Sequence, residues 1–349
     1  MSALRIVHAI RSDGYSGVER YVLRVAAAQA GAGHDVHVIG GDPAHMRGPL
    51  SAAGIGHTAA ARTFEVIRAL NRQRAGADVV NTHMTAADLA AVTALRARRR
   101  GPVVVSTRHF ASRRGRVGPI PLDRVVSGTV DSELAISEAV AAAIGRPSTV
   151  VPSGLAPREP SNAIRTTVVL IAQRLQPEKE TQLALDAFAR SELAPQGWEL
   201  WIAGIGPERS GLEVKARDLS IASSVNFLGY RADLSALMDE CGILLAPCSI
   251  EGLGLSVLEA MQSGLPVVAA RGGGHVELLD GLDTRALFTA GDSDAAARVL
   301  RSLAGDEAGR TALGAAEQAR QRDHYTIDSQ VRGTDAVYRA AIAARRRRT

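Results

Sequence analysis

Apolar residues along the chain gather in short runs that alternate with longer amphipathic stretches of helical spacing. Such runs are typical of buried parallel strands, and the stretches between them indicate helices. In the first half this pattern predicts strands at residues 5–10, 35–39, 79–82, 103–107, 134–137 and 149–152, and helices at residues 17–30, 64–74, 86–98 and 138–144. In the second half it predicts strands at residues 167–171, 200–203, 225–228, 243–246, 267–269 and 286–288, with helices between them. Two doubly wound parallel sheets of an α/β fold are therefore expected.

The domain division follows from a polar stretch near the middle of the chain. Residues 155–165 carry Pro157 and Pro160 and indicate an interdomain linker. We therefore expect a first Rossmann-like domain over residues 1–155, a linker over 156–166, a second Rossmann-like domain over 167–325, and a terminal stretch over 326–349. The last part of the chain shows only helical spacing, at residues 295–303, 307–321 and 329–344. A disordered basic tail is expected over residues 345–348.

Composition limits the classes of protein that fit. The chain has 349 residues, of which 46% are hydrophobic, enough for two domains with their own cores. No apolar run approaches the roughly 18 residues of a membrane span. Arg5, His8 and Arg11 interrupt the N-terminal apolar run, so a first strand is expected there rather than a signal peptide. Cys241 and Cys248 give no disulfide framework and no zinc site, and a cytoplasmic location is the expectation.

Charge is divided unevenly along the chain. Residues 1–160 hold 20 arginines, no lysine and 12 acidic residues, a net charge of +8, and the remainder has a net charge of −3. The basic half includes clusters at residues 96–100 and 108–116. These clusters are either a solvated surface or a contact for an anionic acceptor or the inner face of an anionic membrane. Aromatic residues make up only 3% of the chain, which argues against nucleic acid.

Two glutamates mark the most informative stretch, residues 244–268, which is predicted to be strand, loop, helix, turn and strand. Pro247 ends the strand, and the loop carries Glu251 beside glycines that let backbone N–H groups approach a ligand. Glu259 lies in the second turn of the predicted helix, residues 255–263, and its side chain leans back toward the helix N-terminus. Both carboxylates can then face one crevice at the end of the strand. Taken alone, two such acids are more often solvated surface charges.

The setting of these acids, E-G-x-G-x-x-x-x-E-A-x-x-x-G-x-P-V-V, resembles the signature of the retaining family 4 glycosyltransferases. That resemblance implies the GT-B fold, in which two Rossmann-like domains face each other across a cleft and the last helix crosses back to the first domain. It also implies that Glu251 and the amides of Gly252, Leu253 and Gly254 hold the donor sugar. Glu259 would bind the ribose hydroxyls of the nucleotide.

A second resemblance lies after the first strand of the second domain, in A-Q-R-L-Q-P-E-K-E, which is similar to the family's G-R-L-x-x-x-K-G. It implies that Arg174 and Lys179 clamp the donor diphosphate, where fixed cations stabilise the charge of the leaving group. The family's flanking glycines are Gln173 and Glu180 here. Lysine is rare in this chain, with two lysines against 39 arginines, so Lys179 suggests that a compact point charge is required.

Histidines and arginines of the first domain complete the expected site. In S-T-R-H-F, Thr107 and His109 match the T-x-H that ends a family strand, and His109 is implied to lie near the anomeric carbon. His83, in N-T-H, is an acceptor-side candidate because the family often has H-x-H there. Arg113 and Arg114, in the variable basic segment, are the other acceptor-side candidates. A lone histidine is otherwise more often structural or exposed.

Glycine turns supply the remaining donor-site candidates. Gly17 opens the first helix, where free N–H groups attract a phosphate, although Ser16 is equally an ordinary N-cap. Gly204, in A-G-I-G-P-E-R, resembles the family's G-x-G-P turn, and Arg209 at the third glycine position rules out a dinucleotide fingerprint. Gly273 and Gly274 resemble the family's G-G-x-x-E turn or form a flexible connection. F-L-G-Y, at residues 227–230, is expected beside the nucleotide base.

No metal or other cofactor is expected. The D-S-D at residues 292–294 directly precedes a predicted helix and is read as its N-cap rather than as a metal motif. With cations at Arg174 and Lys179 the diphosphate needs no metal ion.

The resemblance implies a retaining, metal-independent hexosyltransferase that moves a sugar from a nucleotide diphosphate sugar to an acceptor hydroxyl. A UDP-sugar donor is favoured and a GDP-sugar is next, and the acceptor is a glycan, a lipid-linked or a small molecule. Two alternatives stay open, namely an epimerase or phosphorylase of the same architecture and a non-catalytic subunit that binds sugar nucleotides. The sequence predicts no oligomeric state.

Overall fold

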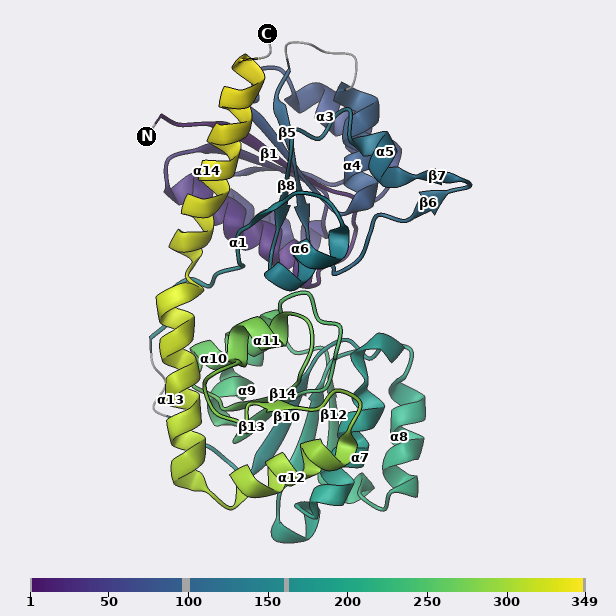
Figure 1. The fold of residues 1–349 in the computed structure, drawn as a ribbon, viewed down its shortest axis with the longest axis vertical. Coiled ribbons are helices and arrows are strands. Elements are labelled where there is room, and N and C mark those ends of the chain that lie inside the picture. Colours follow the sequence, from purple (N-terminus) through teal and green to yellow (C-terminus); the bar gives the residue numbers. More distant parts are fainter. Residues whose placement is uncertain (1, 96–100, 160–162, 348–349) are drawn as a thin grey trace. The chain divides into compact units, whose positions relative to one another are not determined.

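The structure, a computed structural model, describes residues 2–95, 101–159 and 163–347. The chain forms two units, each with its own sheet (Figure 1). Unit 1 contains residues 1–156 and 326–349, and unit 2 contains Pro157–Tyr325. The C-terminal stretch is therefore part of the unit that contains the N-terminus.

The sheet of unit 1 is parallel throughout. Its strand order is β3-β2-β1-β4-β5-β8-β9. The bounds are β1 (Arg5–Ile10), β2 (Asp35–Ile39), β3 (Gly56–Thr58), β4 (Val79–His83), β5 (Val103–Arg108), β8 (Ser132–Ala135) and β9 (Thr149–Val150). A separate antiparallel hairpin, β6 (Arg116–Val117) and β7 (Ile120–Pro121), projects away from this sheet in Figure 1. The helices are α1 (Gly17–Gly31), α2 (Pro43–Ala52), α3 (Thr63–Gln73), α4 (Thr85–Leu95), α5 (Leu122–Val126), α6 (Glu138–Ile144) and α14 (Ile327–Arg346).

Helix α14 is built into the core of unit 1, although it comes last in the chain. Its Tyr338 is fully buried among side chains of the central strands, including Ile6 and Val79. The Tyr338 hydroxyl accepts a hydrogen bond from Asn81 Nδ2 of β4 at 2.6 Å. His34 Nε2 and Asp335 Oδ2 form a further contact at 2.7 Å. The amphipathic spacing of this helix thus covers one face of the first sheet.

The sheet of unit 2 repeats the doubly wound pattern in the order β12-β11-β10-β13-β14-β15. The strands are β10 (Val168–Ala172), β11 (Glu199–Ala203), β12 (Val225–Gly229), β13 (Ile243–Ala246), β14 (Val267–Ala270) and β15 (Leu287–Phe288). The α-helices are α7 (Thr181–Ser191), α8 (Arg209–Asp218), α9 (Leu234–Glu240), α10 (Leu255–Gln262), α11 (Gly274–Leu279), α12 (Ser293–Ala304) and α13 (Glu307–His324). Short 3₁₀ turns are η1 (Pro177–Lys179), η2 (Ala194–Gln196) and η3 (Ala222–Ser224).

Both sheets have a topological switch point, where strand order reverses, between β1 and β4 in unit 1 and between β10 and β13 in unit 2. Open α/β sheets bind ligands at the carboxyl ends of the strands beside such a point. In unit 1, β4 ends at His83 and β5 ends at Arg108. In unit 2, β10 ends at Ala172 and β13 ends at Ala246. His83 and His109 of unit 1, and Arg174, Lys179 and Glu251 of unit 2, therefore lie at or after these strand ends.

The predicted elements agree with the structure except in a few places. Strand β3, helices α2 and α5, and the β6–β7 hairpin were not predicted. The strand expected at residues 134–137 ends at Ala135, because the Ser137 side chain caps α6 by accepting from Val140 N at 3.0 Å. The expectation of a disordered tail is wrong at Arg345, which lies in α14 and donates to the Gly101 carbonyl at 3.1 Å. The basic cluster at residues 96–100 lies outside the described residues.

Candidate functional site

Lys179 and Glu251 form an ion pair at the switch point of unit 2. Lys179 ends η1, which follows β10, and Glu251 lies in the loop that follows β13. Their Nζ and Oε2 atoms are 2.5 Å apart. Burial alone would raise the pKa of Glu251, but the charge and hydrogen bond of Lys179, with a smaller contribution from His275, hold that pKa below its usual value. Glu251 is therefore a fixed carboxylate at neutral pH.

The turn that carries Lys179 is held by the two residues that replace family glycines. Gln173 Nε2 donates to the Lys179 carbonyl at 2.8 Å and to Thr181 Oγ1 at 2.9 Å. Glu180 has the left-handed conformation that glycine favours, with φ of 53°. Its Oε1 accepts from Ser249 N at 3.1 Å and from Ser249 Oγ at 2.5 Å. Side-chain hydrogen bonds thus tie the Lys179 turn to the Glu251 loop.

The glycine turn at residues 272–274 packs directly against the Glu251 loop. A Cβ atom on Gly273 would lie 2.1 Å from the Glu251 carbonyl oxygen, and one on Gly274 would lie 2.3 Å from Leu253 Cα. Gly274 N donates to the Glu251 carbonyl at 2.9 Å. At Gly254, φ is +96° and a Cβ would meet His275 Cδ2 at 3.0 Å. These glycines therefore allow close backbone packing that fixes the acidic loop, and their contact with a donor remains a prediction.

Three other residues predicted for the donor site also belong to unit 2. Gly204 follows β11, and a Cβ there would lie 1.8 Å from the Gln173 carbonyl oxygen. Arg174 is half exposed, with Nη2 3.7 Å from Glu178 Oε1. Glu259 lies in the second turn of α10 and is partly buried. The structure thus gives the positions of these three residues in unit 2, and their contacts with a donor remain predictions.

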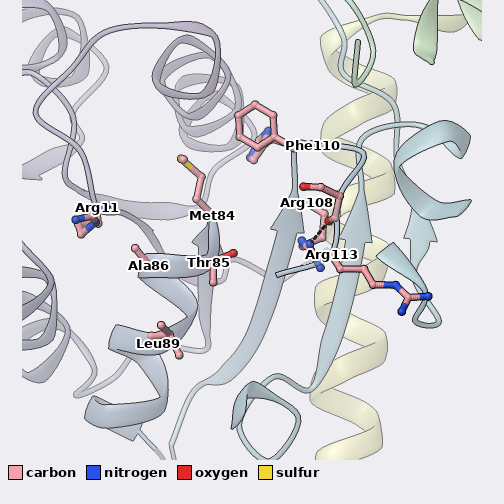
Figure 2. A pocket seen from close by; sticks show the side chains of 10 residues that line it. Arg11, Met84, Thr85, Ala86, Leu89, Arg108, Phe110 and Arg113 are labelled. Carbon is pink, nitrogen blue, oxygen red and sulfur yellow. Dashed lines mark hydrogen bonds between the residues drawn. The ribbon is translucent and has the colours of Figure 1, made fainter. Parts of the chain in front are cut away.

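Unit 1 has a cavity of about 320 Å³ at the carboxyl ends of β1, β4 and β5 (Figure 2). Three arginines on its wall, Arg11, Arg108 and Arg113, make it cationic. The other lining residues are Met84, Thr85, Ala86, Leu89, His109, Phe110 and Ser112. Met84 has φ of 71°, an unusual conformation for a residue with a side chain. A cationic pocket at a switch point is suited to an anionic ligand.

His109 is the end of a row of buried histidines that reaches the cavity. His83 Nδ1 contacts His109 Nε2 at 3.0 Å, and His83 Nε2 contacts His8 Nδ1 at 2.9 Å. His8 Nε2 in turn contacts Gln29 Oε1 at 2.7 Å. Burial lowers the pKa of His109 to about 3, with a further contribution from Arg108, and lowers that of His8 to about 4. Burial also lowers the pKa of His83 well below its usual value, so all three rings are neutral at pH 7. His83 lies behind His109 with no exposed surface, which differs from the expected contact with an acceptor.

Arg114 does not have the exposed position expected of an acceptor-side residue. Its guanidinium is fully buried and bonds Asp88 at 2.7 Å, Asp123 at 2.8 Å and Glu133 at 2.9 Å. Burial opposes this charge, but Asp88 and the hydrogen bonds of the other carboxylates raise the pKa of Arg114 overall. The sequence could not distinguish Arg114 from Arg113, because both are arginines in the same basic segment. In the structure, Arg113 is exposed and lines the cavity.

The Gly17 turn has its polar groups arranged as a helix cap. Ser16 is the N-cap of α1, and both its N–H and its hydroxyl donate to Glu19 Oε2, at 2.9 and 2.8 Å. Gly17 is the first helical residue and is exposed. The ordinary N-cap interpretation of Ser16 is confirmed, and phosphate binding at Gly17 remains a prediction.

The D-S-D segment is also a helix cap. Asp292 accepts from Ala295 N at 2.8 Å at the start of α12, as expected. Within residues 2–95, 101–159 and 163–347, no group of three or more histidine, cysteine or acidic side chains is arranged to hold a metal ion.

Sequence reasoning missed the residues that position the site rather than form it: His8, Gln29, Gln173, Glu180 and His275. A signal existed for His8, because a polar residue inside an otherwise apolar buried strand requires a partner. His275 Nδ1 donates to the Ala270 carbonyl at 3.1 Å. The partners of the other residues come from distant parts of the chain, which spacing alone does not indicate.

Two family profiles match the chain in succession. The profile described as Glycosyltransferase Family 4 matches residues 15–158, and the one described as Glycosyl transferases group 1 matches residues 158–322. The chain is a family 4, group 1 glycosyltransferase. Both units thus belong to this family, and the expected α/β fold of GT-B type is confirmed.

Individual relatives support the same assignment. The lipopolysaccharide core biosynthesis glycosyltransferase LpsE of Rhizobium meliloti is 28% identical over 47% of this chain and 45% of its own length. The D-inositol 3-phosphate glycosyltransferase of Corynebacterium kroppenstedtii is 34% identical over 53% of this chain and 43% of its own length. The chain thus spans less than half the length of these curated relatives. HepE of Anabaena, solved with UDP and glucose, matches 96% of this chain and 99% of its own with a TM-score of 0.80 at 20% identity.

Proposed function

We propose that this glycosyltransferase moves a sugar from a UDP-sugar to an acceptor hydroxyl with retention at the anomeric carbon and without a metal ion. The observation that carries the proposal is the Lys179–Glu251 pair at the switch point of unit 2. HepE, which shares the fold, was solved with UDP, with UDP and glucose, and with UDP-glucose. GDP-sugars are the second donor class.

The two members of the pair are suited to different parts of the donor, Glu251 to the sugar and Lys179 to the diphosphate. Glu251 is an ionised acceptor that suits sugar hydroxyls, which donate hydrogen bonds. Lys179 supplies a compact positive charge beside it, and Arg174 lies on the same connection after β10. A departing diphosphate gains negative charge in the transition state, so these cations lower the barrier without a metal.

The proposed reaction breaks the bond between the anomeric carbon and the phosphate oxygen and forms one between that carbon and the acceptor oxygen. The acceptor proton passes to the leaving phosphate oxygen on the same face, so no enzyme nucleophile is required. Glu251 and the amides of residues 252–254 hold the sugar, Glu259 holds the ribose, and His109 orients a hydroxyl near the anomeric carbon.

We also propose that unit 1 contacts an anionic membrane surface peripherally and that the acceptor is anionic or lipid-linked. No helix among the described residues is long and apolar enough to span a membrane. The β6–β7 hairpin, however, carries Val117 and Ile120 with 65% and 52% of their surfaces exposed. Arg113 and Arg116 are exposed beside them. Exposed apolar side chains flanked by arginines suit a headgroup layer of anionic lipid.

The test combines donor binding with product analysis. Thermal shifts are measured with UDP, GDP, ADP and their sugars, since a ligand at 100 times its Kd adds about 2.7 kcal/mol. We expect a shift with UDP that EDTA leaves unchanged. NMR of the transfer product, or of the free sugar released to water, should show the anomeric configuration of the donor. A new epimer formed without acceptor would instead identify an epimerase, and a shift with NAD alone would overturn the proposal.

Glu251→Gln is the variant that tests the site itself. It keeps the side-chain size but removes the fixed charge, and we expect kcat/KM to fall about 100-fold. Glu192→Gln is the matched control, because that carboxylate of unit 2 is exposed and lies 4.0 Å from Arg301. Equal activity of the two variants would show that Glu251 has no role in the reaction.

A further inference from the structure

The buried histidine row of unit 1 is a continuous chain of hydrogen bonds. It runs from Gln29 of α1 through His8 of β1 and His83 of β4 to His109, which follows β5. The three contacts are 2.7, 2.9 and 3.0 Å long. The rings of His8 and His83 stack with centroids 5.2 Å apart. Only His109 reaches the wall of the cavity.

Each contact in this chain needs one donor and one acceptor. A neutral imidazole has one N–H and one bare nitrogen. Burial keeps all three rings neutral by lowering their pKa values, and His83 is lowered further by its two histidine neighbours. The direction of donation at one end of the chain therefore determines the direction at every other contact.

Gln29 determines that direction. Its Oε1, which can only accept, faces His8 Nε2, so the proton of His8 is on Nε2 and its Nδ1 is bare. The bare Nδ1 of His8 accepts from His83 Nε2–H, and the bare Nδ1 of His83 accepts from His109 Nε2–H. We propose that Gln29, His8 and His83 fix the tautomer of His109 so that Nδ1, its remaining ring nitrogen, is a hydrogen-bond acceptor for a ligand hydroxyl in the cavity.

This inference rests on the proposed function for its consequence in catalysis. A bare nitrogen accepts from a sugar or acceptor hydroxyl but donates nothing to a leaving phosphate. His109 therefore orients a hydroxyl, and Gln29, His8 and His83 are positioning residues that act through it. Tyr21 stands edge-on to His109 with ring centroids 4.7 Å apart and limits rotation of the imidazole. Arg108, the residue before His109 in the sequence, disfavours a positive charge on the imidazole.

The wild-type protein gives the first test without any substrate. Long-range ¹H–¹⁵N NMR of protein with ¹⁵N-labelled histidine separates protonated from bare ring nitrogens by their chemical shifts. A His109→Gln sample assigns the resonances of His109. We expect a bare Nδ1 and a protonated Nε2 on His109. A protonated Nδ1 would overturn the inference, whatever the activity of the enzyme.

A matched pair of variants tests the control by Gln29. Gln29→Leu removes the acceptor at the far end of the chain and should give His109 a mixture of tautomers, with kcat lowered about tenfold and the donor KM little changed. Gln321→Leu makes the same change at a buried glutamine of unit 2, whose Nε2 donates to the Tyr325 carbonyl at 2.9 Å. It should leave the His109 tautomer unchanged.

The outcomes separate the two proposals. If Gln29→Leu keeps a bare Nδ1 on His109 and wild-type kcat, the inference is wrong while the transferase assignment stands. If the tautomers behave as expected in both variants but no sugar nucleotide binds or turns over, the proposed function is wrong and the hydrogen-bond chain is supported.

Discussion

Lys179 Nζ and Glu251 Oε2 are 2.5 Å apart in unit 2, although 72 positions separate the two residues in the sequence. Glu251 is partly buried, and the charge and hydrogen bond of Lys179 hold its pKa below the usual value against the effect of burial. The residue proposed to clamp the diphosphate is thereby tied to the residue proposed to hold the sugar. A substitution of either residue should therefore affect both the diphosphate and the sugar contacts.

Lys179→Ala should therefore impair both functions of the pair. We expect kcat/KM to fall by about 100-fold or more, because the phosphate loses a fixed cation and Glu251 loses the neighbour that lowers its pKa. Lys179→Arg should restore little, since a planar guanidinium does not replace a compact ammonium. Steady-state kinetics with a UDP-sugar measure both effects.

Lys215→Ala is the control for this prediction. Lys215 is the other lysine of the chain and also pairs with a carboxylate, Asp186, at 2.7 Å in unit 2. It lies on α8, away from the strand ends that carry the site. An activity loss of similar size in the two variants would show that a lysine ion pair matters only for folding.

Glu180 offers a test of how the Lys179 turn is held. Glu180→Ala removes the two bonds to Ser249 and keeps the left-handed conformation, whereas Glu180→Gly removes the bonds and relieves the conformation. We expect the alanine variant to be less stable than the glycine variant by about 1 kcal/mol, and both to raise the donor KM. Urea unfolding and kinetics measure the two effects. Equal stability would mean that the backbone at Glu180 is not strained.

Substitutions of the adjacent Arg113 and Arg114 should have different effects, one on acceptor binding and the other on stability. Arg114→Met leaves three carboxylates without their buried cation and should lower the free energy of unfolding by about 3–5 kcal/mol. Arg113→Met, at an exposed cavity position, should leave stability unchanged within about 0.5 kcal/mol and raise the KM for an anionic acceptor. Denaturation curves of both variants settle the assignment, and a stable Arg114→Met protein would contradict the structural role.

Sequence patterns predicted the strands well because buried parallel strands appear as apolar runs, and the bounds expected for β1, β2 and β13 match the structure. Helix α2 was missed because Gly48 and Pro49 break its pattern, although Asp42 and Pro43 form an N-cap and first-turn signal. Family motifs assigned Lys179 and Glu251 to one donor site, but the ion pair between them was not predicted. Glu180 and Gln29 could not be predicted, because their roles depend on partners that only the tertiary structure brings near.

The hairpin of unit 1 gives a prediction for membrane contact. Val117→Ser combined with Ile120→Ser should lower binding to vesicles of anionic phospholipid about tenfold, because both exposed side chains lose apolar surface. Binding should also weaken with salt, since Arg113 and Arg116 attract the lipid charge at about 1 kcal/mol each. Vesicle sedimentation measures both dependences.

Ile164→Ser is the control for the hairpin variant. Ile164 is 91% exposed and belongs to unit 2, so its loss should not alter binding if the hairpin is the contact. Unchanged binding of the double variant, or equal losses in both proteins, would locate the contact elsewhere.

Acid should destabilise unit 1 through its buried histidines. The folded-state pKa values of His8 and His109, about 4 and about 3, lie below the value of about 6.5 for an unfolded chain. Between these values the unfolded chain binds protons that the folded chain excludes, so the free energy of unfolding falls as pH is lowered from 7. At pH 5 the loss is about 2 kcal/mol for each ring.

The His8→Phe variant isolates this effect. It should be less stable than wild type at pH 7 because His83 loses a hydrogen-bond acceptor, but its stability should decrease less between pH 7 and pH 5, by about 2 kcal/mol. Glu251 does not interfere in this window, because its lowered pKa makes its contribution disappear only below about 4.5. Urea unfolding at pH 7, 6 and 5 provides the comparison. Parallel pH dependences in the two proteins would mean that His8 takes up a proton in the folded state, and the neutral histidine chain would then be wrong.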